Sequence, residues 1–367
     1  MLVNNKHYIT IWLDKNNPEI VRTIDQTLLP HKFKIISLKT CNDIIKAIKD
    51  MIVRGAPLIG VAAAYGIYLA SLEAKQKCKT EKQINNYIME KAKQIFNTRP
   101  TAINISNAIK NSLEIILKIK SIEEKIPSAL NFASSLSVEE IIRCKKIGEH
   151  GLELIKRISE EKKEETVNIL THCNAGWLAC IDYGTATAPI YFAHKMGIKL
   201  HVYVEETRPR NQGASLTAWE FLQNKIPHTI ITDNAGGYIM QKGMVDMVIV
   251  GSDRTTLTGD VCNKIGTYKT ALAAKDNNIP FYVALPSSSI DKKIKNGLKE
   301  IPIEERNKDE VKYISGKSKY GITKVLLTPN KSPAKNFGFD ITPARLVTAL
   351  ITEKGVIKPQ KSDIIKA

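Results

Sequence analysis

Residues 167–180 read VNILTHCNAGWLAC, and residues 247–260 read MVIVGSDRTTLTGD. Each stretch opens with an apolar run that favours a β-strand and then reaches a reactive side chain, Cys173 in the first and Asp253 in the second. Ligands of open α/β sheets bind outside the carboxyl ends of the strands. The two stretches therefore predict a thiol and a carboxylate at one crevice, although a buried cysteine and a turn-capping aspartate would produce the same pattern.

Short β-branched runs alternate with helical segments from Thr166 onward. The predicted strands are VNILTH, KLHVYV, HTIIT, DMVIVG, PFYVAL and KVLLT. Such alternation predicts an α/β fold in which helical crossovers join parallel strands. Neither a GxGxxG fingerprint nor a GxxxxGK[ST] loop follows the first strand. We therefore expect a Rossmann-like sheet that binds neither NAD nor ATP in the usual way.

The first 125 residues are expected to form a smaller, mainly helical N-terminal domain after a short β start near residues 7–12. Apolar residues recur at helical spacing over residues 69–95 and 108–122. Residues 126–165 are rich in Lys and Glu and are expected to be a connecting helical region. The Rossmann-like domain is then assigned to residues 166–367.

The composition, with 43% hydrophobic and 25% charged residues, is typical of a globular protein, and 367 residues suffice for two domains. No apolar run of about 18 residues is evident, and the opening residues MLVNNKHYITIW lack the apolar core of a signal peptide. We therefore expect a cytoplasmic protein with no membrane partner.

The formal net charge is +17, mostly from lysines scattered among Asn and Ile, without an arginine-rich stripe or a nucleic-acid-binding motif. A solvated basic surface is expected, with no nucleic-acid partner. The six cysteines form no CxxC pair and no Cys/His metal spacing. Neither a disulfide framework nor a metal site is predicted.

Asn174 to Gly176 are expected to open a helix directly after Cys173. A thiol at a helix N-terminus lies near the positive end of the helix dipole, which would lower its pKa and favour the thiolate. The neighbouring His172 is expected to be structural, because adjacent strand residues point to opposite faces.

The segment after Asp253 is expected to be a polar loop, containing Asn263, Lys264 and Gly266, that leads into a helix. Glycine lets the backbone approach an anion and a helix N-terminus attracts it, so this segment resembles a phosphate cradle. Gln212, at another predicted strand end, is a candidate contact for a sugar hydroxyl.

Two arginines lie in Gly/Pro turns of the N-terminal region. Arg54 precedes Gly55, Ala56 and Pro57, and Arg99 precedes Pro100. Only ten of the 54 cationic residues are arginines, so their placement is informative and indicates anion capture.

Other strand ends leave alternatives open. Arg208 either holds a phosphate or pairs with Glu206. Asp233 either caps the following helix or joins the site.

Longer motifs extend along nearly the whole chain. They are LDK with DQTLLP, IVRGAPLIGVAAAYG, NTRPTAIN, ILTHCNAGWLAC, ETRPRNQGASLTAWE, DNAGGYIM, GSDRTTLTGDVCNKIGTYKTALAA, ALPSSSID, IPIEER and FDITPARLVTALITEKGVI. On these motifs the chain resembles the methylthioribose-1-phosphate isomerase family, which is related to the α, β and δ regulatory subunits of the guanine-nucleotide exchange factor of translation initiation. The resemblance implies a homodimer of two-domain chains, with no metal or organic cofactor.

The resemblance also implies roles for individual residues. Asp253 would be the proton donor and Cys173 the second catalytic residue. The implied substrate-binding residues are Arg54, Gly55, Ala56, Arg99, Gln212, Asn263 and Lys264. The chain departs from the family in having VEETRP where VDETRP is common, and NFGFDITPA where NPAFDVTPA is usual. Neither departure touches Cys173 or Asp253.

The implied reaction is the aldose–ketose isomerisation of 5-methylthioribose 1-phosphate in methionine salvage. A phosphate on the anomeric oxygen prevents opening to a free aldehyde, so Asp253 would protonate the ring oxygen. Cys173 would then either remove the C2 proton as thiolate or stabilise an oxocarbenium-like state during a hydride shift, and the sequence leaves both routes open.

Two alternative functions remain open at this point. One is a sister isomerase acting on 5-deoxyribose 1-phosphate or ribose 1,5-bisphosphate, which differ at C5. The other is a non-catalytic regulatory subunit, which would have no need to keep the reactive pair.

Overall fold

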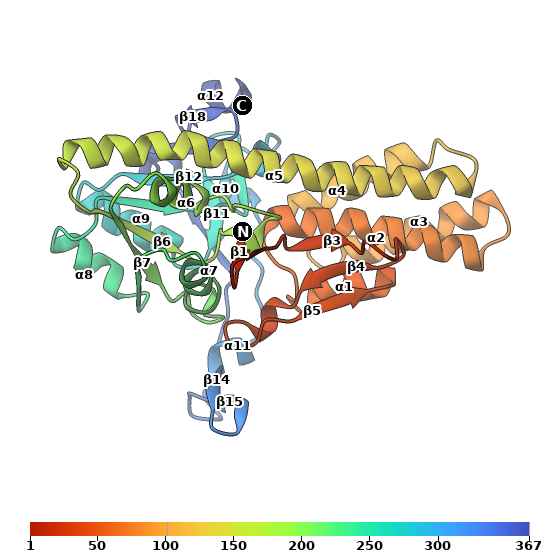
Figure 1. Ribbon diagram of the computed structural model, residues 1–367, viewed down its shortest axis with the longest axis horizontal. Helices are drawn as coiled ribbons and strands as arrows, with labels where there is room; N and C mark the ends of the chain where they lie inside the picture. The colour runs from red at the N-terminus through yellow and green to blue at the C-terminus, as the bar shows by residue number, and fades with distance from the viewer. Residues whose placement is uncertain (101, 367) are drawn as a thin grey trace.

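The computed structural model describes residues 1–100 and 102–366, so Thr101 of the NTRPTAIN motif and Ala367 lie outside it. Figure 1 shows two lobes side by side, with helix α5 (Ile122–Glu161) running along both of them. The first lobe is mainly helical, and the second contains the large sheet. The proposed domain limits at residues 126 and 166 stay a prediction; α5 begins before the first and ends before the second.

A seven-stranded sheet forms the centre of the second lobe. Its strands are β6 (Val167–His172), β7 (Leu200–Glu205), β8 (His228–Ile231), β9 (Met247–Val250), β12 (Phe281–Ala284), β17 (Ala349–Thr352) and β18 (Gly355–Ile357). The spatial order is β18-β17-β12-β9-β6-β7-β8, and every neighbouring pair is parallel except β17 with β18. The predicted fold class, a Rossmann-like parallel sheet beside a smaller, mainly helical domain, is confirmed.

One of the six predicted strands lies outside this sheet. KVLLT falls largely in β15 (Gly321–Leu326), which pairs with β14 (Tyr313–Ser318) in a separate hairpin that projects from the lobe (Figure 1). All of β15 is exposed, whereas all four residues of β17, ALIT, are buried. A parallel strand covered on both faces needs a continuous apolar run, which Thr323 and Lys324 interrupt. The assignment of KVLLT to the sheet was therefore wrong.

Helices cover both faces of the sheet. Helices α5, α6 (Ala188–Lys195) and α7 (Ala218–Gln223) pack their apolar residues on one face. The opposite face is covered by α8 (Ala235–Gln241), α9 (Thr267–Asp276) and α12 (Lys361–Lys366). The carboxyl ends of the strands are left for the loops that carry the candidate site.

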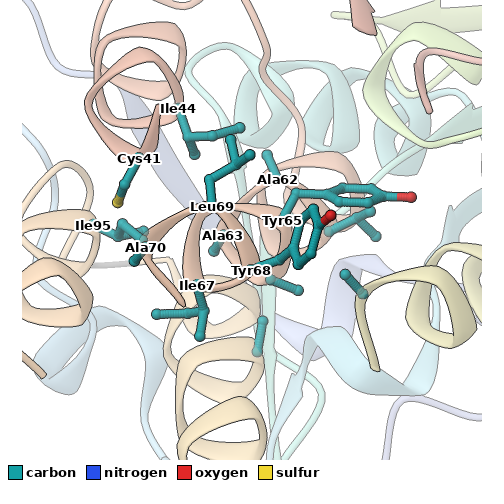
Figure 2. Close-up of a cluster of buried hydrophobic side chains, with 14 of the residues drawn as sticks. Cys41, Ile44, Ala62, Ala63, Tyr65, Ile67, Tyr68, Leu69, Ala70 and Ile95 are labelled. Carbon is teal, nitrogen blue, oxygen red and sulfur yellow. The ribbon is translucent and has the colours of Figure 1, made fainter. Parts of the chain in front are cut away.

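The first lobe is built around a helix that is buried on nearly all sides. Helix α2 (Ala56–Lys77) packs among α1 (Cys41–Lys49), α3 (Glu81–Phe96) and α4 (Ile103–Ile116), and Figure 2 shows its Tyr65 and Leu69 in this core. By length and composition α2 could cross a membrane, which the sequence reading had missed, but 89% of the relevant window is buried inside the protein. Its apolar composition is that of a core helix.

The expected β start of this lobe is only part of what forms. An antiparallel sheet of β3 (Ile11–Leu13), β4 (Val21–Ile24) and β5 (Ile35–Leu38) lies against the helices. The segment read as one helical pattern over residues 69–95 is divided between α2 and α3, because Thr80 caps α3 through a capping box with Gln83.

A small second sheet lies beside the candidate site. Its order is β13-β10-β11-β16, with β13 (Ile290–Asp291), β10 (Arg254–Thr256), β11 (Val261–Lys264) and β16 (Phe339–Thr342). Asn263 and Lys264 therefore lie on a strand that pairs with β16 and not in the expected loop. The strand holds both side chains more firmly than a loop would, and only residues 265–266 remain as the turn into α9.

Short elements complete the fold. They are β1 (Leu2–Val3), β2 (Lys6–His7), α10 (Gly297–Glu300), α11 (Asp309–Lys312) and the single turns η1 (Gln26–Leu28), η2 (Trp177–Ala179), η3 (Gly213–Thr217), η4 (Ser287–Ser289) and η5 (Ala344–Leu346).

The crossing of α5 and α6 depends on two glycines. A Cβ at Gly151 would lie 2.4 Å from Pro189 Cγ, and one at Gly148 would lie 2.8 Å from a Phe192 ring carbon. Helices can approach this closely only where no side chain intervenes.

Gly151→Val is expected to lower the free energy of unfolding by about 1–3 kcal/mol, because the added carbons overpack the α5–α6 contact. Urea unfolding followed by circular dichroism would measure the change. Lys146→Val, at an exposed position of the same helix, provides the matched control. A loss from Gly151→Val no larger than the loss from Lys146→Val would contradict the role assigned to packing at Gly151.

Candidate active site

The predicted site residues surround two small neighbouring cavities at the carboxyl ends of β6 and β9. The first, about 30 Å³, is bounded by Arg54, Gly55, Ala56, Cys173, Asp253 and Asn263, among others. The second, about 20 Å³, also touches Ala56 and Asp253 and is bounded by Arg99.

The two remaining predicted residues, Gln212 and Lys264, line neither cavity but interact with residues that do. The Cys173 Sγ lies 3.7 Å from the Gln212 Oε1, to which it donates. Lys264 is close enough to Cys173 and Asp253 to interact with both electrostatically. The structure therefore brings every predicted residue to one place, while their roles in binding and catalysis stay predictions.

Cys173 directly follows β6 and is 6% exposed. Its φ of +65° lies in the left-handed region, which a side chain other than glycine adopts at an energetic cost. Its N–H donates to Thr207 Oγ1 at 2.8 Å, and its carbonyl accepts from Thr217 Oγ1 at 2.7 Å. These two hydrogen bonds stabilise the left-handed backbone conformation of Cys173, which lines the first cavity.

The helix expected directly after Cys173 is missing. Only the turn η2 follows, and α6 begins at Ala188. Burial raises the pKa of the Cys173 thiol above its usual value, although Arg54 and Lys264 oppose the rise. The expectation of a pKa lowered by a helix dipole was therefore wrong, and the resting side chain is the neutral thiol.

Glu220 of α7, which the sequence reading did not single out, lies buried beneath the loop that follows Cys173. Its carboxylate accepts from two backbone N–H groups of η2 at 3.1 and 3.0 Å, from Asn174 Nδ2 at 2.9 Å and from the Tyr191 hydroxyl at 3.0 Å. A Cβ at Gly176 would lie 1.9 Å from this carboxylate, so only glycine permits the approach. The role of Glu220 could not be predicted from local sequence patterns, because its hydrogen-bond partners come from distant segments of the chain.

Three cationic side chains are buried at the crevice. Arg54, Arg99 and Lys264 are 7%, 8% and 7% exposed. Arg99 Nη2 lies 3.2 Å from a carboxylate oxygen of Glu304, which forms an ion pair with it. Among the described residues, no such carboxylate pairs with Arg54 or Lys264.

The partners of those two cations are neutral. Arg54 donates to the side chain of Asn174 and, at 2.8 Å, to its carbonyl oxygen. Lys264 Nζ donates to the Gly338 carbonyl at 3.0 Å and lies 4.5 Å from the centre of the Phe339 ring. Burial lowers the pKa of Lys264, although the charge interactions with Cys173 and Asp253 oppose the fall. An anionic ligand would offset the cost of burying both charges.

The N-terminus of α2 adds to the positive character of the crevice. Gly55, with a φ of +99°, forms its N-cap, and no side chain caps the helix. A Cβ at Gly55 would lie 2.4 Å from the Ala179 carbonyl oxygen. The free N–H groups of a helix N-terminus attract anions, which suits the position of Gly55 and Ala56 beside Arg54.

The crevice is narrow in the form described. A volume of about 30 Å³ matches one water molecule and is too small for a sugar phosphate. A cleft of about 600 Å³, bounded by Arg54, Gln212, Met51 and the β14 end of the hairpin, lies next to it. A ligand the size of a sugar phosphate could bind in the crevice only if the crevice widened.

The other strand-end residues have structural partners. Arg208 donates to the carbonyls of Pro209 and Val311 and pairs with no carboxylate in the described chain, which rules out the expected Glu206 alternative. The carboxylate of Asp233 accepts from the N–H groups of Thr207 and Arg208 at 2.7 Å each, so it does not cap α8. Both residues shape the loop after β7.

Comparisons with known proteins identify the family of this chain. The model of the Initiation factor 2 subunit family matches residues 52–359. A methylthioribose-1-phosphate isomerase of Desulfatibacillum aliphaticivorans is 55% identical over 99% of this chain and 98% of its own length. That of Sinorhizobium medicae is 53% identical over 97% of this chain and 96% of its own length.

Two solved structures are similar over nearly the whole chain, one named as an isomerase and the other as a translation-factor subunit. The 5-methylthioribose 1-phosphate isomerase of Pyrococcus horikoshii OT3 superposes with a TM-score of 0.84 at 35% identity, covering 98% of this chain and 96% of that one. The delta subunit of translation initiation factor eIF-2B from A. fulgidus gives 0.80 at 39% identity, covering 98% and 99%.

The chain belongs to the Initiation factor 2 subunit family, and within it to the methylthioribose-1-phosphate isomerases. The predicted family and the predicted enzyme class, an aldose–ketose isomerase, are thereby confirmed.

Tyr191→Phe is expected to lower the free energy of unfolding by about 1 kcal/mol, because it removes one of the donors that satisfy the buried Glu220 carboxylate. Urea unfolding of the purified variant would measure this loss. Tyr238→Phe, at a residue that is 60% exposed, removes the same oxygen without that contact. A loss of equal size in the control would contradict the role assigned to the Tyr191 hydroxyl.

Proposed function

We propose that this enzyme converts 5-methylthioribose 1-phosphate to 5-methylthioribulose 1-phosphate. The observation that carries the proposal is the burial of Arg54 and Lys264, both without a carboxylate partner in the described chain, beside a thiol and a carboxylate in one crevice. A phosphorylated sugar supplies the missing anion and the carbons on which the two reactive groups would act. The names of the relatives support the choice of sugar.

The proposed roles follow from position. Asp253 would donate a proton to the ring oxygen as the C1–ring oxygen bond breaks, which opens the furanose. Cationic Arg54, Arg99 and Lys264, with the N–H groups near Gly55 and Ala56, would hold the phosphate. Gln212 and Asn263, amides at the crevice, would contact hydroxyl groups.

The chemical step then moves hydrogen from C2 to C1. C1 is reduced as C2 is oxidised to the carbonyl, and the C2 hydroxyl proton leaves, so no external oxidant or reductant is needed. Cys173 would either remove the C2 proton or stabilise the cationic state during a direct hydride shift. The raised thiol pKa favours the second route, because a neutral thiol is not a base.

Isotope exchange separates the two routes. In deuterium oxide, proton abstraction would place solvent deuterium on C1 of the ketose, whereas a direct hydride shift would not. Substantial deuterium at C1, detected by mass spectrometry, would exclude a purely direct shift.

A substrate panel tests the proposed function itself. We expect the purified enzyme to isomerise 5-methylthioribose 1-phosphate with a kcat/KM at least about tenfold above those for 5-deoxyribose 1-phosphate and ribose 1,5-bisphosphate, since a pocket suited to an apolar C5 group discriminates by one or two orders of magnitude. Ketose formation would be followed for all three. A higher kcat/KM for either of the other two sugar phosphates would identify that sugar as the substrate. If none of the three were isomerised, a regulatory role would be favoured.

Cys173→Ser and Asp253→Asn are each expected to lower kcat by at least about a hundredfold, the usual contribution of a positioned acid or base. Steady-state kinetics on the ketose product would measure the loss. Cys78→Ser and Asp276→Asn make the same atomic changes outside the crevice. Near wild-type turnover by folded Cys173→Ser and Asp253→Asn would refute the proposed chemistry.

We further propose a homodimer, joined through the outer edge of the large sheet. β8 is an edge strand, and apolar side chains near this edge are exposed, including Ile230 at 49%, Tyr238 at 60% and Leu272 at 39%. Covering such a patch is a common reason for association. The cytoplasmic location and the lack of nucleic-acid and membrane partners stay predictions from the sequence.

A further inference from the structure

His172, the residue before Cys173, is 1% exposed and lies between three segments. Its Nδ1 is 2.7 Å from Glu205 Oε2 at the end of the neighbouring strand β7. Its Nε2 is 2.9 Å from the carbonyl oxygen of Ile265, in the turn between β11 and α9. The ring therefore links the strand end that carries Cys173 to the segment that follows Asn263 and Lys264.

Both atoms that face the ring nitrogens are hydrogen-bond acceptors. A carbonyl oxygen cannot donate, so Nε2 must carry a hydrogen. Nδ1 also carries one when it donates to the Glu205 Oε2 that faces it. Glu205 Oε2 additionally accepts from the Thr270 hydroxyl at 2.9 Å, and Oε1 lies 3.8 Å from the Lys269 ammonium. Glu205 Oε1 has no hydrogen-bond partner within the described chain, so a positive charge on the neighbouring ring would offset the cost of burying this carboxylate.

We propose that His172 is a positioning residue held as an imidazolium, which fixes the turn after Asn263 and Lys264 against the strand end of Cys173. His172 borders the first cavity, but both of its ring nitrogens are already bonded within the protein, so it acts through the backbone that it holds. The kinetic consequence rests on the proposed isomerase function, whereas the protonation state and the rigidity of the turn do not.

The turn at residues 265–266 packs closely against the His172 ring. Gly266 has a φ of +103°, and a Cβ there would lie 2.9 Å from His172 Cε1. The Gly266 N–H donates to Asp340 of β16 at 2.7 Å on the other side. The turn is thus held between an imidazole ring and a carboxylate, directly beside the proposed substrate-binding residues.

The charged groups that face His172 come from every element around it. They are Glu205 of β7, Asp233 after β8 and Asp340 of β16, and Lys269 of α9 in turn faces Glu205. Burial disfavours a charged ring, but the hydrogen bond and charge of Glu205 raise the pKa of His172 overall.

The same cluster is also a set of potential metal ligands. Ligand atoms of His172, Glu205 and Asp233 lie within 4.8 Å of one another. However, both ring nitrogens are hydrogen-bonded within the protein, and both Asp233 oxygens accept backbone N–H groups. A metal ion could bind here only by breaking these hydrogen bonds. The bonded imidazole therefore fits the cluster better than a metal ion does.

Nitrogen-15 NMR of the wild-type enzyme tests the protonation state without substrate. The chain has seven histidines, and the His172 signals are those that disappear in His172→Gln or shift in Glu205→Gln. We expect both ring nitrogens of His172 to carry hydrogen at pH 7, above the usual histidine pKa. A neutral ring with a single N–H at pH 7 would overturn the proposal, because the proton would then reside on Glu205.

Hydrogen–deuterium exchange tests the positioning role. We expect His172→Gln to accelerate exchange at residues 265–270 at least tenfold, since one amide cannot reach both acceptors. Glu205→Gln should make the ring neutral while retaining the Ile265 contact, and so accelerate exchange less. His201→Gln, on neighbouring β7, is the matched control and should leave this segment unchanged.

Kinetics complete the test. His172→Gln should lower kcat/KM about a hundredfold, as a small misplacement of binding groups can, with a clear rise in KM. Unaltered exchange at residues 265–270 in a folded His172→Gln variant would overturn the proposal. If the wild-type enzyme turned over no sugar phosphate, the proposed function would fail while the NMR and exchange results still decided the role of His172.

Discussion

Parallel pairing of β6 with β7 and β9 is the constraint on which the rest of the structure depends. In a parallel sheet all carboxyl ends emerge at one edge. The pairing places His172 directly opposite Glu205, and it brings the ends of β6 and β9 together at the crevice. Cys173, Glu205 and Asp253 lie in the same region because each is at or just after the carboxyl end of one of three strands that pair in parallel.

The electrostatics of the crevice follow from this arrangement. Burial of the thiol and of the cations excludes water, which raises the pKa of Cys173 and lowers that of Lys264. Both shifts favour neutral forms in the resting enzyme. A phosphate dianion would reverse the balance for Lys264, so substrate binding itself would supply part of the charge pattern that the chemistry needs. A preorganised site of this kind stabilises charge without the cost of reorienting solvent.

Much of this could be predicted from local patterns. Five of the six predicted strands form in the sheet, since a short, continuous apolar run bounded by turn residues is typical of a buried strand. The prediction that KVLLT joins the sheet was wrong. The run is apolar enough for a strand, but it forms an exposed hairpin, because the burial of a strand depends on the segments that pack against it. The expected helix after Cys173 failed for a similar reason, because the carboxylate of Glu220 satisfies the backbone donors of that loop.

The sequence by itself determined the fold class and the family, and it supplied a candidate reactive pair and a set of candidate binding residues, because strand periodicity and short motifs are local properties. Tertiary structure decided what each group experiences. The pKa of Cys173, the ion pair of Arg99 with Glu304, and the bonding of His172 to both Glu205 and Ile265 depend on residues far apart in the chain. Desolvation and charge pairing act through space, so no pattern along the chain specifies them.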